Sequence, residues 1–414
     1  MTRRPARTIS TPCLTDLRPH APKEIPVNDV PRSEPLLFAP LELRSVTLPN
    51  RVVIPPMCVY AAKDGMPNDW HLVHYGKFAT GGVGLIIGEA TAVEERGRIT
   101  PGDIGLWRDD QVAAHRRLTD FLKGEGCVPG VQLAHAGRRA SSQPPFHGGR
   151  SLTAEDERRL GYVAWQAVAP SPVPEHNDSP IPAELDSADI KAIVDAFAAG
   201  ARRALEAGYE VAEIHGAHGY LLHEFLSPAV NRRDDAYGGD REGRMRLPLE
   251  VTEAVRREWP ADKPLIFRVS AVDGEGEGAW LLDDTLVLCR ELGERGVDVI
   301  DCSSGGIRGP ATAAVVPRGP GYQVPFAEAI KRQTGLTTMA VGLITEARQA
   351  EAILAAGQAD LIAVGREMLD DPNWTLRAAN ELGYGGAPYA AWPPNYGWWL
   401  ERRARTVAMF KDAG

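Results

Sequence analysis

Cysteine is scarce in this chain, and no two cysteines stand close together. The 414 residues contain five, an odd number, at widely separated positions: Cys13, Cys58, Cys127, Cys289 and Cys302. This usage suits reduced thiols in the cytoplasm better than a disulfide framework. The lack of a CxxC motif also argues against an iron–sulfur cluster or a structural zinc site, and we expect no metal.

The chain also lacks long apolar runs and an excess of positive charge. No stretch of roughly 18 apolar residues occurs, so we expect no transmembrane helix. The formal net charge of −9 opposes binding to nucleic acid or to an anionic membrane surface. No GxGxxG motif opens the first helix, which argues against a dinucleotide-binding Rossmann unit. These absences favour a cytoplasmic protein that acts on small molecules.

Residues 1–35 show no hydrophobic periodicity and are rich in proline, arginine, serine and threonine. They lack the apolar core of a secretory signal. The early arginines and the late first acidic residue are weak features of a transit peptide. A disordered N-terminal extension is the better interpretation of this composition.

From residue 36 onward, short apolar runs alternate with longer helical patterns. Eight runs predict strands, at residues 52–54, 85–88, 128–133, 211–215, 265–269, 299–303, 338–341 and 361–364. Helical patterns occupy residues 111–123, 187–207, 244–259, 283–295, 324–333 and 345–356. Eight strand–helix units predict an α/β fold, a (β/α)8 TIM barrel over residues 36–390. An open doubly wound sheet is the alternative.

Two segments lie outside this alternation. An insertion at about residues 138–186 follows the third strand and carries seven prolines. Since it leaves the C-terminal end of a barrel strand, we expect it to cap an active site there. Residues 391–414 form a tail with the aromatic side chains of Trp392, Tyr396, Trp398 and Trp399. Such a tail is expected to dock on its own barrel or on a partner subunit.

The segment after the fourth predicted strand carries the most chemistry. His215 and His218 are three residues apart and can both direct N–H groups at one oxygen atom. Tyr220 adds a phenol that is protonated at neutral pH. Two donors for a developing oxyanion and a nearby proton source suit reduction of a polarised C=C bond. Half of a zinc site or a satisfied core histidine are the alternatives, although helical zinc sites prefer histidines at i and i+4.

Polar and small residues follow the other strands at the same end of the predicted barrel. These positions are residues 55–60, 89–91 and 132–138, together with Arg268, Gly342, Gly365 and Arg366. Glycine-rich turns after strands seven and eight are the usual phosphate site of such barrels, because glycine lets backbone N–H groups approach oxygen closely. Arg366 would add a charge-assisted contact to that phosphate.

Six motifs occur in a collinear order that resembles one known family. They are PPMCVY at 55–60, DWHLVHYGKFATGG at 69–82, QLAHAGR at 132–138, EIHGAHGYLLHEFLSP at 213–228, NRRDDAYGG at 231–239 and AVGLIT at 340–345. The chain resembles the old yellow enzyme family of FMN-dependent ene-reductases, in the thermophilic-like or xenobiotic reductase-like subgroup with a cysteine beside the flavin. The resemblance extends from residue 36 to about residue 402.

The resemblance implies roles for the substrate site. His215 and His218 would hold the electron-withdrawing oxygen of the substrate, and Tyr220 would protonate its α-carbon. Further implied contacts are Cys58 beside the isoalloxazine ring, Tyr60 on the substrate oxygen, and Trp399, which resembles a tail aromatic that reaches a neighbouring subunit's active site.

The resemblance also implies a bound FMN with NADPH or NADH as the reductant. The matching cofactor positions are Pro56, Met57 and Ala90 at the ring, Gln132 and Arg268 at the pyrimidine, and Gly342, Gly365 and Arg366 at the phosphate. The implied activity is ping-pong reduction of α,β-unsaturated carbonyl or nitro compounds by a homo-oligomer, either a dimer or a tetramer.

Three other functions are possible for an FMN barrel. A relative of 2,4-dienoyl-CoA reductase or amine dehydrogenase would carry a clustered cysteine motif for an iron–sulfur centre and a further nucleotide-binding domain, and this sequence has neither. A tRNA dihydrouridine synthase would need a basic RNA-facing surface, which the negative charge opposes. A flavin sensor without turnover would not need the set of His215, His218 and Tyr220. The sequence departs from the resembled family at Arg139, where lysine is frequent, and at Asp240 and Gly243, which replace serine and asparagine.

Overall fold

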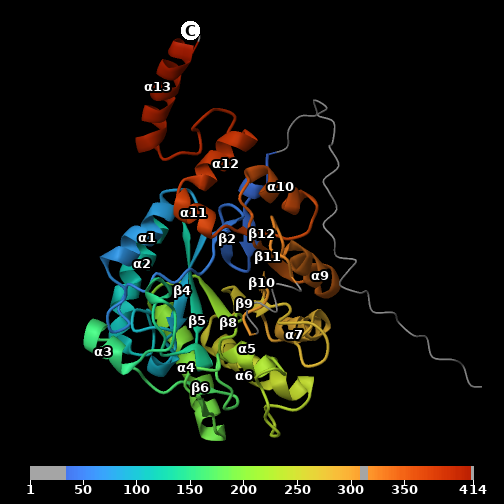
Figure 1. The fold of residues 1–414 in the computed structure, drawn as a ribbon. Helices are drawn as coiled ribbons and strands as arrows, with labels where there is room; N and C mark the ends of the chain where they lie inside the picture. Colours follow the sequence, from blue (N-terminus) through green and yellow to red (C-terminus); the bar gives the residue numbers. More distant parts are fainter. Residues whose placement is uncertain (1–33, 308–315, 412–414) are drawn as a thin grey trace, which may run out of the picture. The chain divides into compact units, whose positions relative to one another are not determined.

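The computed structural model describes residues 34–307 and 316–411, and its compact unit begins at Glu34. The predicted N-terminal extension therefore falls almost wholly outside the described residues. Eight parallel strands close into a barrel at the centre of this unit (Figure 1). In barrel order they are β3 (Val52–Ile54), β4 (Leu85–Ala92), β5 (Val128–Ala134), β8 (Val211–Gly216), β9 (Leu265–Ser270), β10 (Val299–Ser303), β11 (Thr337–Val341) and β12 (Leu361–Ala363). The last strand pairs with the first, which confirms the predicted (β/α)8 barrel.

Helices surround the strands. They are α1 (Asp69–Ala79), α2 (Val112–Gly124), α4 (Ser187–Glu206), α5 (Leu221–Leu226), α6 (Arg241–Glu258), α7 (Leu282–Glu294), α9 (Val324–Thr334), α10 (Ala347–Ala355), α11 (Arg366–Asp370) and α12 (Trp374–Leu382). All six predicted helices are present within a few residues of their expected bounds. Helix α1 was not predicted, and it begins where the Asn68 side chain accepts a hydrogen bond from the Trp70 N–H, 2.9 Å away.

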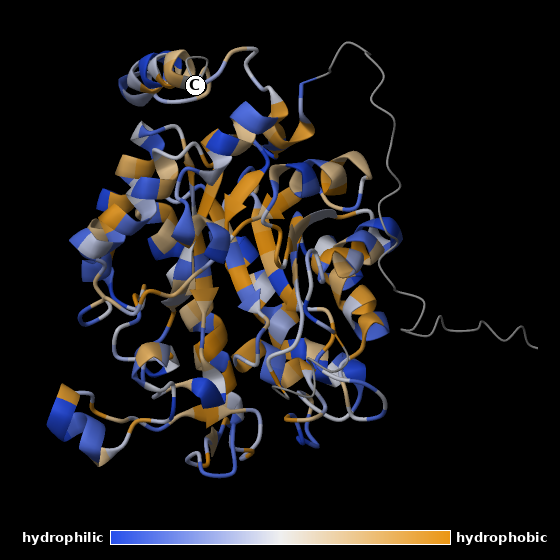
Figure 2. Cartoon of the chain, turned by 45° about the horizontal axis from the view of Figure 1, so that its top comes forward, coloured by the Kyte–Doolittle hydropathy of each residue, from blue (hydrophilic) through white to orange (hydrophobic). Residues whose placement is uncertain are grey.

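The barrel interior is filled and its N-terminal end is covered by a hairpin. Strands β1 (Leu41–Leu43) and β2 (Val46–Leu48) pair antiparallel, and their buried side chains join one apolar cluster with strand residues such as Val53 and Ile266. A second, larger cluster fills the space between the strands and the helices. Both faces of each strand are therefore buried, which explains the continuous apolar runs in the sequence. Figure 2 shows these strands as the most hydrophobic part of the fold.

The insertion between β5 and α4 contains short elements only. They are η5 (Gly137–Arg139), η6 (Pro145–His147), α3 (Ala154–Leu160), β6 (Val168–Ala169) and β7 (Ala183–Glu184). The insertion starts at the C-terminal end of β5, so it lies at the end of the barrel that carries the predicted site. Some of its hydrogen bonds are local, as in the Asp156 carboxylate, which accepts from the Thr153 N–H at 2.8 Å. Others reach distant segments, as in Trp165 Nε1, which donates to the Arg96 carbonyl oxygen at 2.9 Å.

The C-terminal tail is helical where the sequence predicted only an aromatic segment. Helix α13 (Pro394–Lys411) leaves its large apolar side chains in solvent, with Trp399 67% and Phe410 77% exposed. Within one chain, this part of the tail docks on little besides its own neighbouring loop. Across residues 34–307 and 316–411, no helix combines the length and the apolar character needed to cross a membrane.

Truncation of a core aromatic ring should be costly. Phe197 on α4 is completely buried, so Phe197→Ala should lower the free energy of unfolding by about 3–5 kcal/mol through lost burial and a residual cavity. Phe410→Ala removes the same kind of ring from an exposed site and should change the free energy of unfolding by less than about 0.5 kcal/mol. Urea unfolding followed by circular dichroism measures both. Equal losses in the two variants would contradict the packing described here.

Candidate active site

The mouth of the barrel contains a cavity of about 330 Å³. Its wall comes mainly from the C-terminal ends of β9, β10, β11 and β12 and from the loops that follow them. Five of the predicted site residues line it: His218, Arg268, Gly342, Gly365 and Arg366. The structure therefore brings together residues that are up to 148 positions apart, because the strand ends converge at one end of the barrel.

His215 and His218 are joined by a tight turn that aims their rings at each other. The ring centroids are 5.2 Å apart, and the Tyr220 ring lies 5.1 Å from that of His215. His218 has a left-handed backbone with φ of 61°, which is strained for a residue with a side chain. The predicted three-residue cluster is therefore present, and it depends on contacts that hold this turn.

Three neighbours fix the strained turn. The His218 N–H donates to Ser270 Oγ at 3.0 Å, and Arg139 Nη1 donates to the His218 carbonyl oxygen at 2.6 Å. Gly306 packs directly against the same residue: a Cβ on Gly306 would lie only 2.2 Å from the His218 carbonyl carbon. None of these three partners was predicted, since each contact depends on loops from different strands.

Burial sets the protonation of the cluster. It lowers the pKa of both His215 and His218 well below the usual value, and the nearby Arg268 charge lowers each further. Both imidazoles are thus neutral at pH 7 and can each donate one N–H. Burial raises the pKa of the Tyr220 phenol, so this group keeps its proton. The cluster offers neutral donors and a neutral acid.

Arg139 places a positive charge beside that acid. Its guanidinium lies 5.3 Å from the Tyr220 ring centroid and forms an ion pair with Glu175, with Nε and Oε1 2.8 Å apart. The charge of Arg139 lowers the pKa of Tyr220, in opposition to the larger effect of burial. The sequence identified Arg139 only as a departure from the resembled family. Its position directly after the QLAHAGR motif was the one feature that could have predicted its place in the site.

The segment after β3 lies against the same cluster. Burial, followed by the charges of Asp103 and Glu89, raises the pKa of the Cys58 thiol, which is therefore protonated. Tyr60 has a left-handed φ of 55°, and its ring meets Phe146 of the insertion edge to face at 6.3 Å. The insertion thus contributes to this side of the mouth, in line with the predicted cap.

Arg268 is held by buried acidic groups behind the cavity. Its Nε lies 3.0 Å from Asp301 Oδ2, and its Nη2 donates to Ser303 Oγ at 3.0 Å. Gln132 Nε2 donates to Glu213 Oε1 at 2.7 Å. Burial is the main cause of the raised pKa values of both carboxyls. The pKa of Glu213 rises to about 8, and that of Asp301 also rises. The Asp301 carboxyl thus holds the guanidinium in place, while the Glu213 carboxyl is paired with Gln132.

The far end of the cavity is small-residue backbone flanked by cations. Gly342 has φ of +124°, and a Cβ there would come within 3.0 Å of the Tyr322 ring. Arg366 and Arg318 both line this end, and Arg318 was not predicted. Open backbone beside two guanidinium groups is chemically suited to hold a phosphate.

The remaining predicted residues differ in how they reach the site. Ala90 lines a narrow cleft together with Tyr220. Met57 Sδ lies 3.4 Å from the position of a Cβ on Gly365, and Pro56 precedes it in the same segment. Trp399 lines none of the cavities at the barrel mouth, so in a single chain it is not brought to the site. Its contact with substrate stays a prediction that requires a second copy.

Comparison with known proteins identifies the family. The model of the NADH:flavin oxidoreductase / NADH oxidase family matches residues 36–384. The NADPH dehydrogenase of Geobacillus sp. (strain WCH70) is 46% identical over 352 residues, which cover 84% of this chain and 95% of that protein. The chain belongs to this family, the old yellow enzyme family. It is a flavin oxidoreductase, as the sequence predicted.

Solved structures agree with this placement. A morphinone reductase variant in complex with tetrahydroNAD superposes with a TM-score of 0.67 at 28% identity, over 84% of this chain and 91% of that one. The 2-naphthoyl-CoA reductase gives a TM-score of 0.73 at 21% identity, which shows the shared barrel fold alone. The superposed region covers 86% of this chain but only 53% of that larger protein.

His223 should make the stability of the fold pH-dependent. It is buried on α5, and its Nδ1 accepts from the Gly219 N–H at 2.9 Å, which holds the turn that carries His218. Burial, and then the charges of Arg138 and Arg139, lower the pKa of His223 to about 3. The unfolded chain takes up this proton below about pH 6.5 and the folded chain does not, so stability falls as the pH drops.

The measurement compares urea unfolding at pH 7 and pH 5. The His223 contribution to the loss of unfolding free energy over this interval should be about 2 kcal/mol. His223→Gln lacks the titrating group, so its loss should be smaller than that of the wild type by this amount, whatever its stability at pH 7. The same loss in both proteins would show that His223 titrates normally in the folded state.

Proposed function

We propose that this enzyme is an FMN-dependent NAD(P)H oxidoreductase that reduces the C=C bond of α,β-unsaturated carbonyl or nitro compounds. The observation that carries the proposal is the cluster of His215, His218 and Tyr220 beside a cavity walled by Arg268. FMN, when bound, supplies hydride that it has taken from NADPH or NADH. Because one pocket serves the reductant and the alkene in turn, the kinetics should be ping-pong.

The residues around the cavity fit FMN. Arg268 and Gln132 offer guanidinium and amide groups to the polar edge of a flavin, and a cation there stabilises negative charge on the pyrimidine. Gly342 and Gly365 leave open backbone that a Cβ would fill, and Arg366 adds charge for the phosphate. We assign Pro56, Met57 and Ala90 to packing and backbone contacts with the ring.

The imidazoles hold the substrate oxygen in this proposal. His215 Nδ1 is buried and has no hydrogen-bond partner among the described residues, which costs about 1–3 kcal/mol unless a ligand satisfies it. A carbonyl or nitro oxygen between His215 and His218 would accept both N–H groups. As negative charge moves onto that oxygen, preorganised neutral donors stabilise it without giving up a proton.

Tyr220 then protonates the α-carbon. Its raised pKa keeps the phenol protonated before the reaction, and the adjacent Arg139 charge stabilises the phenolate left after proton transfer. Both effects act on the phenolate: burial destabilises it, and the Arg139 charge offsets part of that cost when the proton leaves. We assign Tyr60 to a further hydrogen bond on the substrate oxygen and Cys58, as a neutral thiol, to contact with the flavin and the substrate.

The experiment that tests the function is anaerobic addition of NADPH to the purified protein, followed by 2-cyclohexenone. Bleaching of the flavin absorbance by NADPH and its recovery on addition of the enone are expected. Protein without flavin, or bleached protein that no activated alkene restores, would end the proposal, and the second result would favour a flavin sensor.

Loss of the Tyr220 hydroxyl should affect only one half-reaction. Tyr220→Phe keeps the ring but removes the acid, so recovery of the flavin absorbance with enone should slow by roughly 100- to 10,000-fold. Bleaching by NADPH should keep its rate, since no proton is donated there. Stopped-flow absorbance follows the two steps separately. A variant with wild-type recovery would remove Tyr220 from the mechanism.

Loss of one hydrogen-bond donor to the substrate oxygen should also slow only the half-reaction with the enone. His215→Ala should slow recovery with enone by roughly 100- to 1,000-fold through loss of one hydrogen bond to the developing oxyanion. Exposed His147 in the insertion lines none of the cavities at the mouth, and His147→Ala should match the wild type. Equal slowing of bleaching and recovery in His215→Ala would contradict the role assigned to the histidine.

A further inference from the structure

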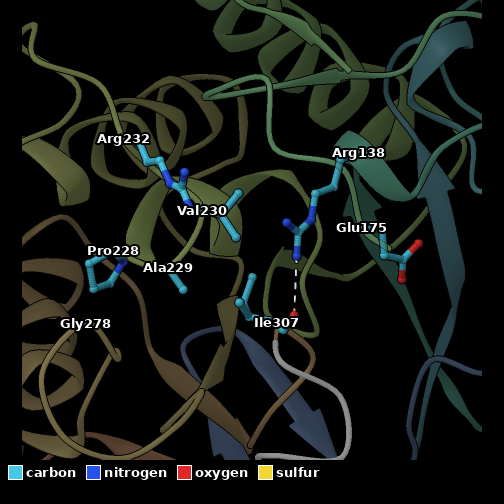
Figure 3. A pocket seen from close by; sticks show the side chains of 8 residues that line it. All are labelled: Arg138, Glu175, Pro228, Ala229, Val230, Arg232, Gly278 and Ile307. Atoms are coloured by element: carbon cyan, nitrogen blue, oxygen red, sulfur yellow. Dashed lines mark hydrogen bonds between the residues drawn. The ribbon is translucent and has the colours of Figure 1, made fainter. Parts of the chain in front are cut away.

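A cavity of about 430 Å³ lies beside the active site and plays no part in the mechanism above (Figure 3). It is formed where η5, the segment after α5 and the loops after β9 and β10 meet the insertion. Its wall consists of Arg138, Glu175, Pro228, Ala229, Val230, Arg232, Gly278 and Ile307. Two of these residues are arginines, from different elements.

Arg138 carries a buried charge that no carboxylate neutralises directly. The residue is 8% exposed, and its guanidinium donates only to the backbone carbonyls of Pro174 at 3.4 Å and Ile307 at 3.3 Å. No ion pair within 4.0 Å involves Arg138 in the described part of the chain. A buried cation without a counter-charge is costly, so an anion in the adjoining cavity would be stabilised.

The acidic groups near Arg138 are already engaged or neutral. The Glu175 carboxylate forms its ion pair with Arg139, with Nε and Oε1 2.8 Å apart. Glu224 accepts a hydrogen bond from the Arg138 backbone N–H, and burial raises the pKa of Glu224 to about 8. Both carboxyls favour the charged form of Arg138 through space, but neither forms an ion pair with its guanidinium.

Arg232 supplies a second guanidinium from the opposite wall. Its side chain is exposed and takes part in none of the hydrogen bonds or ion pairs found among the described residues. Figure 3 shows the side chains of Arg138 and Arg232 extending from opposite sides toward the space around Val230. Planar guanidinium groups of this kind match the oxygens of a phosphate, to which they donate two hydrogen bonds at once.

One further cavity lies between this one and the active-site cavity and shares lining residues with each of them. The further cavity, of about 260 Å³ at the edge of the insertion, shares Glu175 and Ile307 with the first. That second cavity shares Arg139, Gly306 and Tyr322 with the active-site cavity. The three spaces therefore adjoin in a row, from His218 at one end to Arg232 at the other. A ligand that reaches from the active site to Arg232 must be elongated and must carry phosphate away from its reactive end.

We propose that Arg138 and Arg232 bind a phosphate group of the nicotinamide dinucleotide reductant while its nicotinamide lies at the active site. The inference rests on the proposed function, since it assumes that NADPH or NADH enters this pocket. The activated alkenes are too short to reach both ends of the row. The phosphate is either the pyrophosphate common to both reductants or the 2′-phosphate of NADPH, and the experiment separates the two.

The test uses the exposed arginine, because Arg138 is too deeply buried for a clean substitution. Arg232→Gln and Arg232→Lys are prepared with flavin bound, and flavin bleaching is followed with NADPH, NADH and 1-benzyl-1,4-dihydronicotinamide, which has no phosphate. Loss of one charged hydrogen-bond donor should weaken the apparent affinity of Arg232→Gln for the dinucleotide by about 10- to 100-fold. Arg232→Lys should recover most of it, and the benzyl reductant should react as with the wild type.

A binding measurement without turnover complements the kinetics. Calorimetric titration with NADP⁺ and NAD⁺ should show the same loss in Arg232→Gln. A loss for both dinucleotides assigns the pyrophosphate, and a loss for NADP⁺ alone assigns the 2′-phosphate. Arg348→Gln on α10 removes the same charge from an exposed site outside these cavities and should bind as the wild type does.

Two results would overturn the inference. Wild-type affinity of Arg232→Gln for both dinucleotides would remove the arginine from binding. An equal loss of rate with the benzyl reductant would show a structural effect instead. Failure of the proposed function looks different, since neither NADPH nor the benzyl reductant would then bleach the flavin of the wild-type protein.

Discussion

The geometry of the active site depends on one strained turn between β8 and α5. His218 adopts a left-handed backbone, which costs energy that the surrounding contacts must offset. Ser270 and Arg139 bind its N–H and its carbonyl oxygen, and His223 binds the N–H of the next residue. These partners come from three different segments of the chain. A turn fixed from several sides holds the two imidazoles at one separation, which is what a two-donor oxygen site requires.

Burial gives the site its electrostatic character. The same loss of water contact lowers the pKa of the histidines, raises that of Tyr220 and raises that of Cys58, so all four groups are neutral at pH 7. The lasting charges are guanidinium groups, which stay protonated even when buried. The site therefore separates two tasks: neutral groups donate hydrogen bonds or a proton, and arginines stabilise negative charge.

The sequence predicted the barrel well because parallel strands buried on both faces appear as continuous apolar runs. It also predicted the strand-end residues, since the fold places every C-terminal strand end at one mouth. It did not predict the contacts of Ser270, Gly306 or Arg318, which depend on how separate loops meet and not on spacing along the chain. Helix α13 was missed because its proline, its glycine and its crowded aromatic residues give no clear helical pattern.

Trp399 illustrates a different limit. Its side chain is exposed in the single chain, and its contact with a neighbouring subunit stays a prediction. The same exposure along α13 has a physical consequence. An isolated helix of this length is marginal in water, and its stability in a protein comes mainly from packing of an apolar face. The exposed tryptophans therefore leave this 18-residue helix without that packing in the single chain.

The distribution of arginines links the two cavities at the mouth to the overall charge. The protein carries a formal net charge of −9, which repels an anionic dinucleotide at long range. The cavity walls at the mouth, however, contain the guanidinium groups of Arg138, Arg139, Arg268, Arg318 and Arg366, of which Arg139 pairs with Glu175 and Arg268 with Asp301. Salt screens the distant surface charges more than charges at the walls of a cavity. An acidic protein can therefore still have a locally cationic mouth, as binding of the proposed anionic cofactor and reductant requires.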